Sequence, residues 1–286
     1  MNLKPSLCRR GTIVPYFQIK NRFDGVDLFE VECDTLKEAV ALAVQSGTCL
    51  DGASLQGADL ANVDLSGAEL RDADLMGANL SRSDLSGAKL ADAKLTGATL
   101  AEANLAEADF DHANLAQANL READLRDATL DDANCTGANF SGTKLAKAHC
   151  DDTDFSSTSL QAAELDGAFL HGANFTEADL SNAYFRGAYM GAVEFKGSVI
   201  KNAELDGADL RGARNILRIG PSSTGFQMVA VPKNCVITVD AEAGYFPSLE
   251  AARRDCDDAY QHWIDMIERH AELCGWLVSG DQETPS

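Results

Sequence analysis

A large apolar residue occupies every fifth position from Leu50 to Leu210, at 33 successive positions without one insertion. Leu fills most of these positions, and Phe, Met, Ile or Cys fills the others. We call this position i. Position i−2 is nearly always Ala, with Val, Ser or Thr in a few places, and Gly recurs at i+2. Such a regular period must match the geometry of a repeating structural unit, so it constrains the fold more than composition does.

This period excludes an α-helix and favours a short extended segment. Five residues turn an α-helix by about 500°, so successive large residues would not form one apolar stripe. In an extended chain, side chains alternate between faces, so positions i−2 and i point the same way. Positions i+1 and i+2 then turn a corner, where Gly is favourable because it accepts positive φ. Each pentapeptide is therefore predicted to form one side of a closed coil.

The repeated motif A(D/N)LxG, as in GADLANVDLSGAELRDADLMGANL at 57–80, resembles the pentapeptide repeat family. The resemblance implies an all-β solenoid, a right-handed four-sided parallel β-helix with twenty residues per coil. Over residues 48–214 this predicts about eight coils and a rod about 40 Å long. Residues twenty apart should stack inside the rod, and the predicted core includes Phe155, Phe175, Phe195, Cys135 and Cys150.

Residues 1–47 are predicted to form an N-terminal cap. Two short strands within 16–33 surround the hairpin turn Asp24–Gly25, and a helix follows over 34–47. The Thr35–Glu38 pair is typical of a helix capping box. This hairpin and helix resemble the leader of pentapeptide repeat proteins found in bacteriophages and prophages.

Residues 215–286 are predicted to form a C-terminal strand–helix module with a disordered tail. The segments NILRI, FQMVAV and CVITV have strand character, and an amphipathic helix follows from Phe246 to Trp276. Two interpretations of this helix stay open. It either caps the last coil or forms a homodimer contact.

The sequence contains no recognised catalytic, metal or cofactor motif. The eight cysteines form no CxxC pair, the five histidines lie beside no known nucleophile motif, and there is no HExxH or Walker A sequence. We therefore expect a non-enzymatic protein without cofactor or metal. No segment has the length of a signal peptide core or a membrane helix, which predicts a cytoplasmic protein that does not bind a membrane.

The net charge of −21 argues against direct binding to nucleic acid and favours a protein partner with a basic surface. Residues 46–213 carry 28 acidic and 12 basic side chains, a net charge of −16. Spread along a rod of about 40 Å, this is about one charge per 2.5 Å. Duplex DNA carries about one per 1.7 Å, which is the same range.

Twenty-residue spacing groups the acidic residues into two columns of candidate partner-binding residues. The first column lies at a corner and comprises Asp72, Asp92, Asp111, Asp131, Asp132, Asp151 and Asp152. The second lies at position i−1 and comprises Asp64, Asp84 and Asp124. The alternative is that this charge only keeps a repetitive rod soluble and prevents end-to-end stacking.

The family resemblance implies two functions that involve a partner. Some pentapeptide repeat proteins are DNA mimics that bind the DNA-binding surface of DNA gyrase or topoisomerase IV, and we favour this function for the acidic rod. The alternative is a phage-associated structural or scaffolding protein that binds its partner through the C-terminal module. Family members that protect topoisomerases commonly carry projecting loops, whereas this repeat has no insertion.

Overall fold

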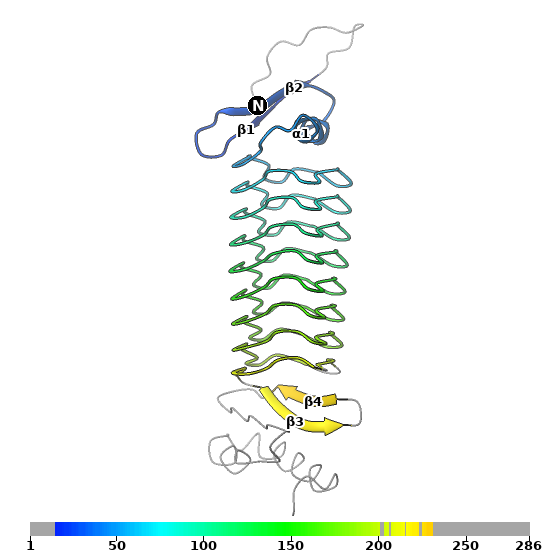
Figure 1. Cartoon of the computed structure of the whole chain (residues 1–286). Coiled ribbons are helices and arrows are strands. Elements are labelled where there is room, and N and C mark those ends of the chain that lie inside the picture. Colours follow the sequence, from blue (N-terminus) through cyan, green and yellow to red (C-terminus); the bar gives the residue numbers. More distant parts are fainter. Residues whose placement is uncertain (1–14, 201–202, 206, 215, 223–224, 231–286) are drawn as a thin grey trace, which may run out of the picture.

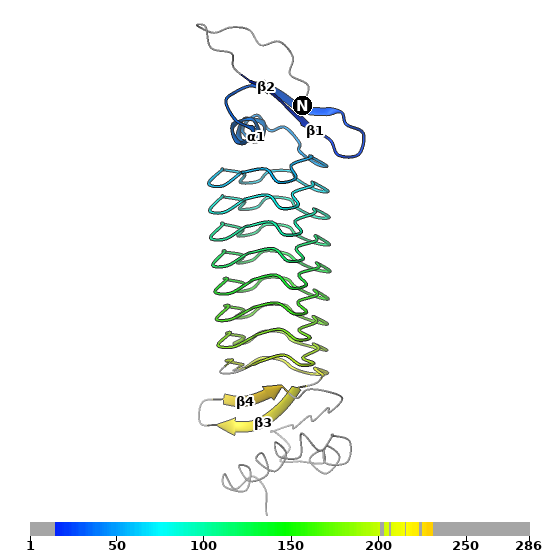
Figure 2. The same cartoon turned by 180° about the vertical axis from the view of Figure 1, so that it is seen from behind.

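The computed structural model describes residues 15–200, 203–205, 207–214, 216–222 and 225–230. They form a rod of stacked coils with a hairpin and a helix at its N-terminal end (Figures 1 and 2). The helices and strands are β1 (Tyr16–Lys20), β2 (Asp27–Glu32), α1 (Leu36–Gln45), β3 (Ile216–Ser222) and β4 (Gly225–Ala230). Strands β1 and β2 pair antiparallel, and so do β3 and β4.

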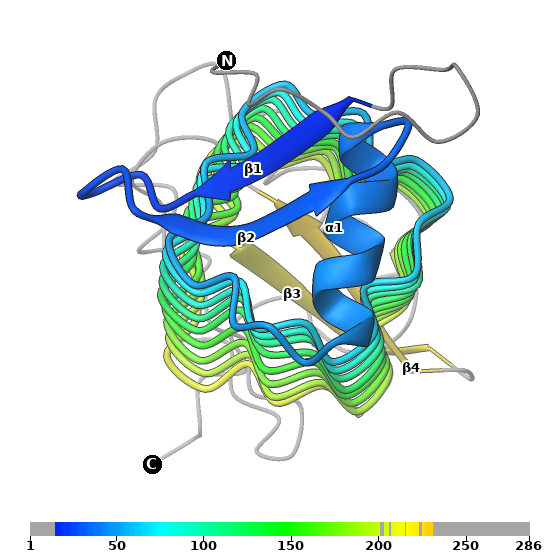
Figure 3. The ribbon, with the colours of Figure 1, turned by 90° about the horizontal axis from the view of Figure 1, so that it is seen from above.

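Each coil of the rod contains twenty residues and four sides. Parallel bridges join each residue at position i−1 to the residue twenty positions later, from Ser54 with Asp74 to Glu194 with Arg214. Viewed along the rod axis, the coils superimpose as nested squares (Figure 3). The predicted four-sided coil is confirmed.

Backbone hydrogen bonds hold the coils together and close the corners. The amide of Leu50 donates to the carbonyl of Glu69 in the next coil at 2.9 Å, and the amide of Asp74 donates back to Ala53 at 2.8 Å. At the corner, the amide of Ala53 donates to the carbonyl of Leu50 at 2.9 Å. Every described residue at i+2 from 52 to 212 has positive φ, whereas its neighbour at i+1 does not. These are the features of a type II turn, which explains the recurring Gly.

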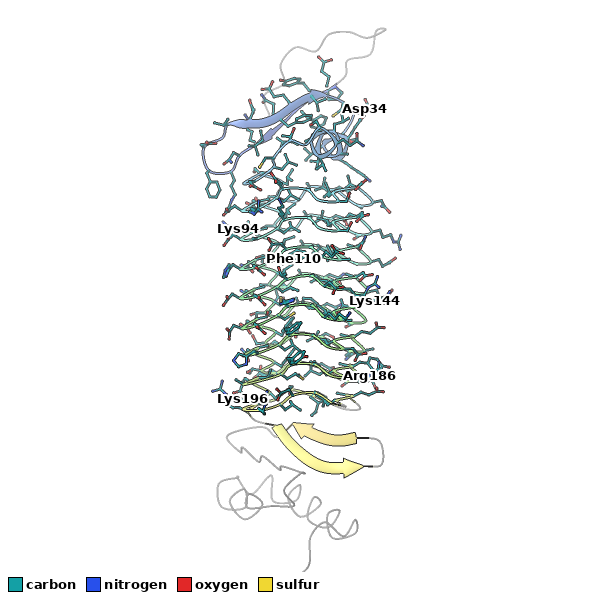
Figure 4. All side chains as sticks on the ribbon, viewed as in Figure 1. Asp34, Lys94, Phe110, Lys144, Arg186 and Lys196 are labelled. Carbon is teal, nitrogen blue, oxygen red and sulfur yellow. The ribbon has the colours of Figure 1, made fainter. Side chains whose placement is uncertain are left out.

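The interior of the rod is filled by the residues that the period predicts. All residues at positions i and i−2 are buried between residues 50 and 200. Phe155, Phe175 and Phe195 stack with ring centroids 5.2 and 5.8 Å apart, and Cys135 and Cys150 are fully buried. Figure 4 shows Phe110 within the rod, while Lys144 lies at its outer surface. The predicted core is confirmed.

The N-terminal hairpin and helix cover the first coil. Ile19 of β1 and the α1 residues Val40 and Ala43 are buried in the same apolar core as the coils. The side chain of Thr35 accepts from the amide of Glu38 at 3.1 Å, as the capping pattern predicts. The return bond of the capping box is shifted by one residue, because the Glu38 carboxylate accepts from the amide of Asp34 at 3.0 Å.

The second hairpin differs from its prediction in length. Strand β3 continues through Gly220 and Pro221, so only residues 223–224 separate it from β4. The pairing register shifts between Ile219 and Pro221, an irregularity that accommodates proline in a strand. The segment CVITV, the predicted C-terminal helix and the tail lie outside the described residues.

Candidate partner-binding surface

The hydrogen-bond pattern explains why Asp and Asn recur at position i−1. In each pentapeptide the coil and corner bonds engage four of the five amides, and the amide at i+1 is left over. An Asp or Asn at i−1 accepts from this amide, as in Ser66 with Asp64 at 3.0 Å and Ser86 with Asp84 at 3.0 Å. Such Asx turns satisfy a backbone donor locally. Many of the acidic residues therefore stabilise corners.

At some corners where i−1 is neither Asp nor Asn, an aspartate of the preceding coil replaces the Asx turn. After Thr129, His149 and Phe169, the amide at i+1 has no Asx side chain two residues before it. The aspartate at i+1 of the preceding coil then accepts instead. The three bonds are Asp131 to Asp111 at 3.1 Å, Asp151 to Asp131 at 2.8 Å and His171 to Asp151 at 2.8 Å.

The second predicted column is engaged in such local bonds. Hydrogen bonds from Ser66 lower the pKa of Asp64, and Asp84 also accepts from Asn104 at 2.9 Å. The Arg126 guanidinium binds both carboxylate oxygens of Asp124 at 2.8 and 2.6 Å, and this contact lowers the pKa of Asp124.

The structure does not bring the two predicted columns together. With four sides per twenty residues, the side that carries Asp64, Asp84 and Asp124 does not adjoin the corner of the first column. One flat partner surface centred on that corner cannot also cover this side. The separation follows from the twenty-residue coil, because Asp64 and Asp72 lie eight residues apart within it.

The first column lies along one edge of the rod. We call it the acidic edge: Asp72, Asp92, Asp111, Asp131, Asp132, Asp151 and Asp152. Its i+2 residues Asp92, Asp132 and Asp152 are exposed. Asp72 is half-exposed and lies 3.4 Å from Arg22, and the exposed His112 interrupts the column 3.8 Å from Asp132.

Negative charge is concentrated at this corner of the rod. Between residues 50 and 200, the corner formed by residues 51–52 and by each pair twenty residues later carries eight Asp and one Arg. Each of the other three corners carries equal numbers of acidic and basic residues over the same span. One edge therefore holds a net charge of −7, while the other edges are neutral.

Burial raises the pKa of Asp131, and the neighbouring carboxylates of Asp111 and Asp151 add to this rise. A raised pKa in the folded state means that the charged form is penalised there. This penalty is absent below the unfolded-state pKa and appears as pH rises through the folded-state pKa.

We predict that Asp131→Asn increases the free energy of unfolding at pH 7, because the amide oxygen can still accept from Asp151 and the repulsion disappears. Asp131→Ala should lower it by about 1 kcal/mol, because the amide of Asp151 loses its acceptor. Urea denaturation at low salt checks both. The advantage of Asn should vanish below about pH 3.5. Equal losses for Asn and Ala at pH 7 would contradict this role.

Two further surface features escaped the sequence analysis. Outside the rod, His149, Phe169 and Tyr189 stack with ring centroids 4.5 and 4.9 Å apart, which stabilises that side of the coils. At the N-terminal hairpin, Phe23 is exposed and Arg22 lies over its ring. An aromatic residue beside the Asp24–Gly25 turn was the only signal for the latter.

Within the described ranges, no group of three or more His, Cys, Asp and Glu could hold a metal ion. Burial raises the pKa of the Cys135 and Cys150 thiols, so both are protonated core residues. No helix in this part of the chain has the length and apolar character needed to cross a bilayer.

A rod of square coils with an apolar interior and one charged edge defines a solenoid protein built from five-residue repeats. Residues 48–214, more than half of the chain, match the family described as pentapeptide repeats. The chain therefore belongs to the pentapeptide repeat family, and its solenoid is a right-handed β-helix.

Several solved structures resemble this chain. HetL, a pentapeptide repeat protein involved in heterocyst differentiation regulation from the cyanobacterium Nostoc sp. strain PCC 7120, is 30% identical, with 56% of this chain and 84% of HetL covered and a TM-score of 0.30. QnrB1, a plasmid-mediated fluoroquinolone resistance protein, is 24% identical, with 54% and 77% covered and a TM-score of 0.40. A pentapeptide repeat protein from the Arabidopsis thaliana thylakoid lumen is 29% identical, with 37% and 68% covered and a TM-score of 0.20. No curated protein matches the chain.

Proposed function

We propose that this protein is a non-enzymatic DNA mimic whose acidic edge binds the basic DNA-binding surface of a type II topoisomerase such as DNA gyrase. The observation that carries the proposal is the concentration of negative charge on one edge. If negative charge served only solubility, it would have no reason to be balanced by basic residues at the other three corners, whose net charge is zero between residues 50 and 200. A charged line on one side is what a partner with a complementary groove can recognise.

The spacing of this charge supports the same partner. The seven carboxylates of the acidic edge span four coil steps, or about 19 Å, which gives about one carboxylate per 3 Å. A single DNA strand carries one phosphate per 3.4 Å of helix axis. The acidic edge thus resembles the charge line of one strand more closely than the whole rod resembles a duplex.

The charged residues of the acidic edge are held in place, which also favours binding of a partner. The backbone at position i+2 has positive φ, the left-handed αL conformation, and is fixed by hydrogen bonds within and between coils. The side chains of Asp92, Asp132 and Asp152 therefore project from a rigid and regularly repeated backbone. The carboxylates of Asp111, Asp131 and Asp151 are held on backbone amides. Such an arrangement loses little conformational entropy on binding.

The test is a gyrase supercoiling assay with the full chain. We expect inhibition that weakens steeply as KCl rises from about 50 to about 300 mM, because the contact is electrostatic. Relaxed plasmid should accumulate without cleavage products, since the chain replaces DNA on the enzyme. If supercoiling is unaffected when the chain is in large excess over gyrase at the lowest salt, the proposal fails for this enzyme.

The proposal places the protein in the cytoplasm, with its partner. The phage-associated scaffold and the homodimer contact depend on residues 215–286, most of which lie outside the described residues. Both stay predictions. Deleting 215–286 should abolish partner capture if the scaffold function holds, and should leave gyrase inhibition intact if the acidic edge is sufficient.

A further inference from the structure

The loop between β1 and β2 projects beyond the outline of the coils (Figure 3). It carries Phe23, which is 67% exposed, and Val26, which is 58% exposed. These are the two most exposed large apolar side chains in the part of the chain that the structure describes. Neither side chain is part of the buried core of the cap.

The loop is fastened to the first coil. The amide of Arg22 donates to the carbonyl of Gly52 at 2.7 Å, and the amide of Ser54 donates to the carbonyl of Lys20 at 2.8 Å. The side chain of Asn21 accepts from the amide of Phe23 at 2.9 Å and so shapes the loop internally. Phe23 is therefore presented on a rigid support.

Phe23 lies next to the N-terminal end of the acidic edge. Gly52 occupies the same corner as Asp72, one coil earlier, and a Cβ at Gly52 would lie 3.2 Å from ring carbons of Phe23. The guanidinium of Arg22 lies 4.3 Å from the Phe23 ring centroid and 3.4 Å from a carboxylate oxygen of Asp72. The side chain of Arg22 thus contacts both Phe23 and Asp72, the first carboxylate of the acidic edge.

We propose that Phe23, with Val26, is an apolar anchor that enters a pocket on the same partner protein whose basic groove receives the acidic edge. This inference rests on the proposed function. Interfaces commonly derive most of their affinity from a few buried aromatic residues, while surrounding charges direct the encounter. The partner therefore has a basic groove of about 19 Å that ends at an apolar pocket.

The first test measures binding of the full chain to immobilised DNA gyrase at several KCl concentrations. Phe23→Ala should raise the dissociation rate about tenfold to a hundredfold, because a buried ring is lost, without changing the salt dependence. Val26→Ala should weaken binding less. Val199→Ala is the matched control, since Val199 is 50% exposed and lies on a different side of the rod.

A second pair of variants moves the ring without removing it. Gly52→Ala must displace Asn21 or Phe23, because its Cβ would lie 2.8 Å from the Asn21 amide nitrogen. Gly57→Ala has similar backbone strain, with φ of +64° against +71°, and an open surrounding. Gly52→Ala should therefore weaken gyrase binding by at least about tenfold relative to Gly57→Ala.

The outcomes separate the two proposals. If the unmodified chain does not bind gyrase, both the proposed function and the anchor fail for this partner. If it binds and Phe23→Ala dissociates at the original rate, only the anchor is wrong. If sedimentation velocity instead shows that Phe23→Ala converts a dimer to a monomer, Phe23 contacts a second copy of this chain. The proposal that it anchors a partner protein is then also wrong.

Discussion

Leu125→Asp should unfold the central coils and lower the free energy of unfolding by at least about 4 kcal/mol. Leu125 is fully buried at position i in the middle of the rod. The substitution removes apolar contacts and also places a carboxylate where no polar group can pair with it. Because each coil packs only on its neighbours, the loss should interrupt stacking in both directions. Urea denaturation followed by circular dichroism measures the effect.

Two control variants show whether the in-or-out position decides the result. Asp124→Asn, one residue away, should cost less than about 1 kcal/mol, because the amide oxygen still accepts from Arg126 and only an exposed ion pair is weakened. Leu125→Met, which preserves apolar volume, should cost less than about 1.5 kcal/mol. Similar losses in the free energy of unfolding for Leu125→Asp and Asp124→Asn would refute the assignment of Leu125 to the interior and Asp124 to the outer surface.

The five-residue period predicted which residues face the core of this protein, because side chains of an extended chain alternate between faces. The inward positions and the N-terminal hairpin and helix follow from local rules of alternation and turn formation, whereas the stacking of Phe155, Phe175 and Phe195 depended on the twenty-residue coil that the family resemblance implies. Alternation and turn formation depend only on residues that are close in sequence, so they can be predicted from one sequence.

The candidate surface was less predictable, because the same residue type serves two purposes. Asp64 and Asp92 are both exposed, yet the carboxylate of Asp64 accepts from the amide of Ser66, while Asp92 lies at a corner position with positive φ. Only the assignment of hydrogen bonds shows which carboxylates are bound to a backbone amide.

The proximity of Phe23 to the acidic edge could not be predicted for a different reason. Phe23 and Asp72 are far apart in sequence and belong to different elements. Their proximity depends on how the hairpin docks on the first coil, through Arg22 and Gly52. Such docking contacts follow no periodic rule.

Changing Asp72, Asp92, Asp132 and Asp152 together to Asn should weaken gyrase inhibition by at least about 30-fold at low salt, if each exposed carboxylate contributes about 0.5 kcal/mol or more. The dependence of inhibition on KCl should become correspondingly shallower. The fold should be retained, because all four residues occupy αL backbone, which Asn tolerates well. Titration of the supercoiling assay at several KCl concentrations gives both quantities.

A matched quartet distinguishes recognition of the acidic edge from a general effect of charge. Its members are exposed acidic residues with positive φ on the other three corners, changed as Glu107→Gln, Glu122→Gln, Asp127→Asn and Glu177→Gln. Both quartets remove four negative charges from the same backbone conformation, so solubility and long-range attraction change alike. If the acidic edge is the binding surface, the matched quartet should retain most of the inhibition. If the acidic edge contacts the enzyme, the effect must depend on which corner carries the substitutions. Equal losses for the two quartets would therefore mean that gyrase responds to the total charge of the protein.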